Sequence, residues 1–215
     1  MTRMRALVAI LGLCLVAGAA GAQDAQLLQI RDEATREMVR TFITAANTRG
    51  VPAKPLLSRA LQGQAFNANA KKVEQALVRF EKNWRRSREV LGSQASSDEI
   101  VAGADALLNG VPESELAALR RTADRMPGGR RPITVEIGVL TELVAKNVSP
   151  KEAGKTVREL MARGATGAQL TELTAAVQQD VALGVSPVAA LELRGKGVMS
   201  LLPPPVSSVS AQKTP

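Results

Sequence analysis

The helical spacing of apolar residues, interrupted at intervals by glycine and proline, is the feature that most limits how this chain folds. Nearly every segment places apolar side chains three or four residues apart, and strand-like alternation is confined to 133–137. The segments predicted to be helical are 24–47, 54–61, 68–91, 98–108, 113–125, 132–146, 150–163, 167–183 and 187–194. The sequence therefore predicts an all-α fold of eight or nine helices.

Start signals for helices occur at the expected places. Ser149-Pro150-Lys151-Glu152 is typical of a capping box with proline at the first helical position. Ser96 with Glu99, and Thr166 with Gln169, have the same spacing. Because the predicted connections are short, about two to six residues, we expect consecutive helices to form antiparallel hairpins.

Three turns resemble one another along the second half of the chain. Gly110-Val111-Pro112, Asn147-Val148-Ser149-Pro150 and Gly184-Val185-Ser186-Pro187 recur with their valines 37 residues apart (148 − 111 and 185 − 148). The predicted hairpin-like repeats are therefore about 111–147, 148–184 and 185–200. Two architectures stay open: a short, irregular α-solenoid of stacked hairpins, or an ordinary bundle that reuses the same turn chemistry.

Residues 1–22 have the pattern of a secretory signal peptide. Two arginines open the segment, an apolar run follows, and an Ala-x-Ala motif ends at Ala22. We expect cleavage between Ala22 and Gln23. The apolar run is shorter than the roughly 18 residues of an uncleaved anchor, and Leu13 before Cys14 disfavours a lipoprotein. The expected location is the periplasm or the extracellular medium.

The ends of the chain bound the domain organisation. We expect one all-helical domain over 23–200, followed by a disordered Pro/Ser-rich tail at 201–215. Removing the signal lowers the net charge from +8 to +6 because two arginines leave with it. Such a domain is long enough to build a core without disulfides.

Composition excludes several kinds of chemistry. The chain has no histidine, and its one cysteine, Cys14, lies within the predicted signal. His- or Cys-based nucleophilic catalysis and ordinary zinc sites therefore lack their residues. No phosphate-binding glycine loop occurs, so no cofactor or metal is expected.

Carboxylates leave one catalytic alternative. Glu113 and Glu115 are the nearest candidates for a glycan-cleaving acid. Both positions equally suit the first turn of a helix, where the dipole favours negative charge. A glycan-cleaving enzyme of the envelope is thus the least favoured of three functional hypotheses.

Basic residues gather in two places, on the helix expected at 68–91 and at 120–131. The candidate anion- or partner-binding residues are Lys82, Arg85, Arg86, Arg120, Arg121, Arg130 and Arg131. Such a face suits anionic lipid or polysaccharide, whereas export and the scarcity of aromatics argue against nucleic acid.

These observations favour a non-catalytic helical binding or scaffold protein of the bacterial envelope, with a protein partner. The alternative is a basic-face binder of an anionic envelope polymer or membrane surface. Charges on every predicted helix of the mature chain argue against a transmembrane segment.

Overall fold

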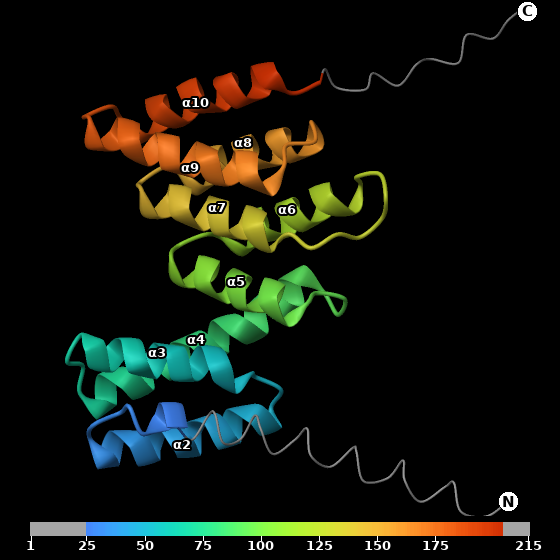
Figure 1. Cartoon of the computed structure of the whole chain (residues 1–215). Coiled ribbons are helices and arrows are strands. Elements are labelled where there is room, and N and C mark those ends of the chain that lie inside the picture. The colour runs from blue at the N-terminus through green and yellow to red at the C-terminus, as the bar shows by residue number, and fades with distance from the viewer. Residues whose placement is uncertain (1–24, 204–215) are drawn as a thin grey trace, which may run out of the picture. The chain divides into compact units, whose positions relative to one another are not determined.

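The computed structural model describes residues 25–203, and the regular elements within that range are helices packed antiparallel to their neighbours (Figure 1). The predicted all-α class is confirmed. The helices are α2 (Glu33–Thr48), α3 (Ala53–Ala65), α4 (Ala70–Leu91), α5 (Ser97–Leu108), α6 (Glu113–Asp124), α7 (Thr134–Ala145), α8 (Pro150–Ala162), α9 (Gly167–Ala182) and α10 (Pro187–Leu201). The predicted signal peptide, its cleavage site at Ala22 and Gln23, and the tail from residue 204 lie outside the described residues.

The chain divides into two compact units, Met1–Lys82 and Asn83–Pro215, and the boundary falls within α4. In the first unit α2 packs on α3. Its core is aliphatic apart from one aromatic ring, that of Phe80, which is fully buried. The guanidinium of Arg59 lies 4.5 Å from the centre of this ring, which adds a cation–π contact to the apolar burial.

The first helix differs from its prediction. It begins at Glu33, because the Asp32 carboxylate accepts a hydrogen bond of 2.7 Å from the Thr35 backbone N–H and caps the helix. The apolar spacing over 24–47 predicts a buried face made of Leu27, Ile30, Ala34, Met38, Phe42 and Ala45. Of these, Leu27 and Ile30 are buried, but the buried face of α2 consists of Thr35, Val39, Ile43 and Ala46.

Within the second unit, helices pack on their neighbours and on the helix two places along. Thus α5 packs on α7 and α7 on α9, while α6 packs on α8 and α8 on α10. One continuous cluster of Leu, Ile, Val, Ala and Met side chains fills the space between them. These contacts bury the apolar face of each amphipathic helix.

The three recurring valines occupy the same position in three helix C-terminal caps. The N–H of Val111 donates to the carbonyl of Ala106 at 3.0 Å, and that of Val148 to the carbonyl of Leu143 at 3.1 Å. The residue before each valine is left-handed, with φ of 88° at Gly110 and 65° at Asn147. This is the Schellman motif. Its apolar residue is buried at Val111 and Val148, whereas Val185 is 38% exposed. The sequence repeat is therefore a repeat of helix-ending chemistry.

The predicted capping boxes are confirmed at Ser96 with Glu99 and at Thr166 with Gln169. At α8 the Ser149 hydroxyl accepts from the Glu152 N–H, as predicted. The Glu152 carboxylate, however, accepts from the Ser149 hydroxyl at 2.8 Å. Its predicted bond to the Ser149 backbone N–H is absent from the hydrogen bonds of the described residues.

Helix α10 runs to Leu201, beyond the predicted end at 194. Gly195 and Gly197 weaken the local preference for helix. However, a methyl group at Gly195 would lie 3.2 Å from Thr156 Cγ2, so this glycine lets α10 pack closely on α8. Leu202 is also buried, and the Arg163 guanidinium donates to its carbonyl at 3.3 Å. The folded region thus extends past the predicted boundary at 200.

Candidate functional site

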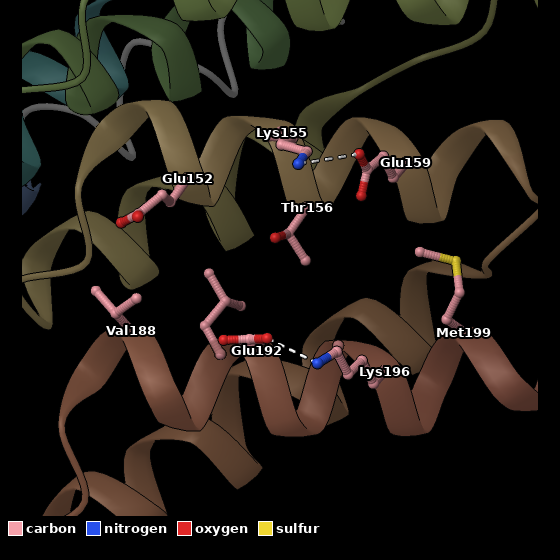
Figure 2. Close-up of a pocket in the computed structure, with 10 residues that line it drawn as sticks. Glu152, Lys155, Thr156, Glu159, Val188, Glu192, Lys196 and Met199 are labelled. Carbon is pink, nitrogen blue, oxygen red and sulfur yellow. Dashed lines mark hydrogen bonds and ion pairs between the residues drawn. The ribbon is translucent and has the colours of Figure 1, made fainter.

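A groove of about 350 Å³ runs between α8 and α10 (Figure 2). It is lined by Glu152, Lys155, Thr156 and Glu159 from α8, and by Val188, Leu191, Glu192, Gly195, Lys196 and Met199 from α10. Its size lies at the lower end of the range for ligand pockets, about 300–1,000 Å³.

The middle of the groove is narrow because Gly195 approaches Thr156 there. Apolar side chains are available along its length: Leu191 is buried, Val188 is 42% exposed, and Met199 is half-buried. In Figure 2, Val188 and Met199 lie toward opposite ends of the drawn segment of α10. Such a groove offers apolar contacts to side chains that enter from solvent. A flexible Met side chain can adapt to them.

Charged side chains border these apolar contacts. The Lys196 ammonium lies 2.7 Å from Glu192 Oε1, and the Lys155 ammonium lies 3.8 Å from Glu159 Oε1. The hydrogen bond from Lys196 holds the pKa of Glu192 below its ordinary value. With Glu152, the lining carries three carboxylates and two ammonium groups. The groove therefore suits a partner segment with apolar side chains and a positive or neutral character.

Sequence reasoning did not identify this groove. Its two walls are α8 and α10, and neither helix carries a recognisable motif on the groove side. One signal was available, because the 37-residue spacing predicts that corresponding helices stack on each other. No spacing within either helix indicates that Thr156 faces Gly195.

Arg120, one of the candidate anion- or partner-binding residues, is buried. Its side chain is 5% exposed and lies beside the Glu99 side chain, which is 4% exposed. Arg120 Nη1 donates to Glu99 Oε1 at 3.0 Å and to the Arg131 carbonyl at 3.0 Å. Asp124 Oδ1 lies 2.7 Å from Arg120 Nη2. Arg120 is therefore not part of an exposed basic surface, since its partners lie inside the second unit.

Arg130 and Arg131 hold the loop before α7. The Arg130 guanidinium donates to the Gln94 carbonyl at 3.1 Å, and Arg131 Nη2 lies 3.0 Å from Glu136 Oε1. These bonds connect the loop to the end of α4 and the start of α7. Both side chains are consequently committed to structural contacts.

The remaining basic candidates are exposed. Arg86 is paired with Glu113 at 2.5 Å, and Arg85 lies on the exposed part of α4. Arg121 is exposed on α6, and Lys82 is exposed at the end of the first unit. Within the second unit, Arg120 and Arg121 are neighbours in the chain but only Arg121 faces solvent.

The two candidate acids are engaged in ion pairs. Glu113 binds Arg86, and Glu115, which is half-buried, binds Arg158 on α8. Neither of them lines the groove between α8 and α10. The ion pair between Glu115 and Arg158 connects α6 to α8, so the Glu115 carboxylate stabilises the packing of these two helices.

Residues 25–203 contain no cluster of three or more acidic, cysteine or histidine side chains arranged to hold a metal ion. Over the same range, none of the helices has the length and apolar character required to cross a membrane. Comparisons with protein-family models, curated proteins and solved structures find no match to this chain.

An ion pair near the groove predicts acid sensitivity. Arg194 donates to both oxygens of Asp180, at 2.7 and 2.6 Å. These hydrogen bonds hold the pKa of Asp180 below its ordinary value of 3.8. The ion pair therefore stabilises the fold above pH 3.8, and this contribution is lost as the pH falls through the lower pKa of the folded state.

We expect the melting temperature of Asp180→Asn to fall less between pH 6 and pH 2 than that of the unaltered chain. Arg194→Gln should have a similar effect, because either change removes the same bond. The melting temperature of the double variant, measured across this pH range, should then fall by the same amount as that of either single variant. Additive effects of the two substitutions would contradict the assignment of the acid response to this pair.

Proposed function

We propose that this chain is a non-catalytic scaffold that binds a protein partner through the groove between α8 and α10. The observation that carries the proposal is an open groove in which the apolar side chains of Val188, Leu191 and Met199 lie among five charged ones. An extended or helical peptide can place apolar side chains between the two helices while its polar groups remain solvated.

We further propose that the second unit is a short α-solenoid. Support comes from the packing of each helix on the helix two places along, α5 on α7, α7 on α9, α6 on α8 and α8 on α10. Stacked helical repeats present extended surfaces that are commonly used for partner binding. We also propose that the protein binds its partner after export, in the periplasm or the medium, because residues 1–22 have the pattern of a signal peptide.

The basic-face alternative has less support. Arg120, Arg130 and Arg131 are held by carboxylates or carbonyls, and Arg86 is paired with Glu113. An anion would have to compete with these intramolecular partners. Glycan cleavage is likewise less favoured because Glu113 and Glu115 are both in ion pairs.

Site-specific photo-cross-linking tests the scaffold proposal. A photoreactive residue at Val188, on the groove, should capture one recurrent protein partner in intact producing cells. The same residue at Phe66 serves as the control, because Phe66 is 78% exposed and belongs to the first unit. Recovery of the same collection of abundant proteins from both positions would contradict the proposal.

A second variant separates binding from folding. Lys155→Glu adds a carboxylate to a groove that already carries three, and the Lys155 side chain is 70% exposed. This variant should therefore abolish capture from position 188 while the melting temperature changes little. Undiminished capture in Lys155→Glu would show that the partner binds elsewhere.

A further inference from the structure

The chain leaves α10 at one end of the groove between α8 and α10. The Leu202 N–H donates at 3.3 Å to the carbonyl of Met199, a residue that lines the groove. Leu202 then has an extended backbone, with φ of −91° and ψ of 151°, and its side chain is buried. Packing therefore sets the direction in which the chain leaves the helix, beside the Met199 end of the groove.

The other wall of the groove also holds this exit. Arg163 directly follows α8, and its guanidinium donates to the carbonyls of Leu202, at 3.3 Å, and Pro203, at 3.2 Å. Met199 marks this end of the groove, and Val188 marks the other (Figure 2). The chain is thus bound to both groove helices at the point where segment 204–215 begins.

Segment 204–215 is long enough to run along the whole groove. The groove extends along α10 from Val188 to Met199, which are 11 residues apart (199 − 188), about 17 Å of helix. The three prolines at 203–205 favour polyproline II, which rises about 3.1 Å per residue. About six residues of the segment therefore match the length of the groove.

The apolar side chains of the segment have a spacing that suits the groove. Val206 and Val209 are three residues apart, so polyproline II places them on one face, about 9 Å from each other. In the groove, Met199 and Leu191 are about 12 Å apart along α10, with the close approach of Gly195 between them. A segment that runs back along α10 would place one valine on each side of this narrow point.

The charge of the segment complements that of the groove. Three carboxylates and two ammonium groups give the lining a net charge of −1 (2 − 3). Segment 204–215 contains one lysine, Lys213, and no acidic side chain. Running back from the exit, it brings Lys213 toward Glu152, which lies at the Val188 end (Figure 2). The segment thus has the apolar and neutral-to-positive character that the groove suits.

We propose that segment 204–215 binds in the groove between α8 and α10, through Val206 and Val209, and competes there with the protein partner. The competition rests on the proposed function of the groove, whereas the docking of the segment does not. A segment tethered beside its site has an effective concentration of about 1 mM, so weak contacts are enough to occupy the groove. The partner then binds only those chains whose groove is free, which lowers its apparent affinity.

Disulfide formation tests the docking without any partner. Cys14 is the only cysteine in the sequence, so Cys14→Ser provides a cysteine-free background. In that background, Val206→Cys with Glu159→Cys, in the groove, should form a disulfide within one chain. This reaction should be about tenfold faster than the same reaction of Val206→Cys with Leu193→Cys.

Leu193 is the matched control because it is exposed on α10 outside the groove. Its side chain is 62% exposed, and it lies two residues from Gly195, about 200° around the helix from the contact with α8. Equal rates for the two cysteine pairs would show that the segment samples both faces, which overturns the proposal. A disulfide that links two chains instead of one would overturn it as well, since the occupant would then come from a second copy.

Partner capture tests the competition. Removal of residues 204–215 should raise photo-cross-linking from position 188 about tenfold. In the full chain, Val206→Ser with Val209→Ser should raise capture in the same way, because serine loses the apolar contacts with the groove. Unchanged capture after removal of the segment would overturn the competition.

A second pair of substitutions separates the valine face from the segment as a whole. Ser207→Ala with Ser210→Ala changes side chains on another face of polyproline II, so capture should stay at the level of the unaltered chain. A rise equal to that of the valine pair would contradict docking through Val206 and Val209. Failure of the proposed function is distinguishable, because it would abolish capture from every chain and leave the disulfide between positions 206 and 159 unaffected.

Discussion

Arg120→Met is expected to destabilise the second unit by about 3–5 kcal/mol, the range observed when one member of a buried ion pair is removed. Glu99 would keep its buried carboxylate and lose its cationic partner. Its remaining hydrogen bonds come from the N–H groups of Ser96, at 2.8 Å, and Ile133, at 3.1 Å. Two backbone donors do not compensate for burying a full charge.

This network has a structural consequence beyond the pair itself. The Glu99 side chain belongs to the cap of α5, contacts α6 through Arg120, and accepts from the N–H of Ile133 ahead of α7. One carboxylate thereby connects three helices. Removal of Arg120 should loosen all three together.

Urea unfolding followed through Trp84 fluorescence measures this effect, because Trp84 is the only tryptophan and lies in the second unit. Lys155→Met, which removes an exposed ion pair with Glu159, is the control and should change stability by about 0.5 kcal/mol or less. The double variant Glu99→Gln with Arg120→Met should recover about 1–2 kcal/mol, since no unpaired charge stays buried. A loss no larger than the control's would contradict the buried-network assignment.

Gly103→Ala should destabilise the same unit by about 1–3 kcal/mol, although alanine is the better helix former by about 1 kcal/mol. A methyl group at position 103 would lie 2.2 Å from Ser87 Oγ and 3.1 Å from Leu91 Cδ1. Ser87 is fully buried on α4, so it has little room to move. The glycine therefore permits close contact between α4 and α5 within the second unit.

Placing the glycine on α4, at position 87, instead of on α5 tests whether close packing of the two helices explains the effect. Ser87→Gly combined with Gly103→Ala should restore most of the loss, because one methyl group is added where a hydroxymethyl group is removed. Gly138→Ala on α7 is the matched control. Nothing lies within 4 Å of a methyl group there, so this substitution should stabilise the fold by about 0.5–1 kcal/mol. Destabilisation of similar size at both glycines would contradict the packing explanation.

The boundaries of the helices from α4 to α9 could be predicted to within two residues because the signals that set them are local. Ser96, Thr166 and Ser149 each accept a hydrogen bond from a backbone N–H three residues later. The caps that follow α5 and α7 close over five residues, at Val111 and Val148. Such interactions need no knowledge of the rest of the fold.

The candidate site was less predictable because helix faces compete for burial. In α2, the stripe that includes Met38 and Phe42 has the apolar spacing of a core. The structure instead buries Val39 and Ile43, and leaves Met38 and Phe42 along a surface groove. Both faces are apolar, so periodicity alone does not distinguish them. Contacts with α3 decide between them.

Arg120 illustrates the same limit for charged residues. Its neighbours in the chain, Arg121 and Asp124, are exposed, as arginine and aspartate side chains ordinarily are. Burial depends on Glu99, which is 21 residues away in the sequence. A single sequence contains no signal for such a pairing.

The amino-acid sequence by itself determined the helical class, the ends of the helices from α4 to α9 and the recurring valine caps, because each of these rests on residues within one or two turns of each other. The tertiary structure alone decided the buried face of α2, the burial of Arg120, the full length of α10 and the groove between α8 and α10. Each of these depends on contacts between helices distant in the chain. Gly195 against Thr156 and Arg163 against Leu202 are two such contacts, and neither can be read from residues close together in the sequence.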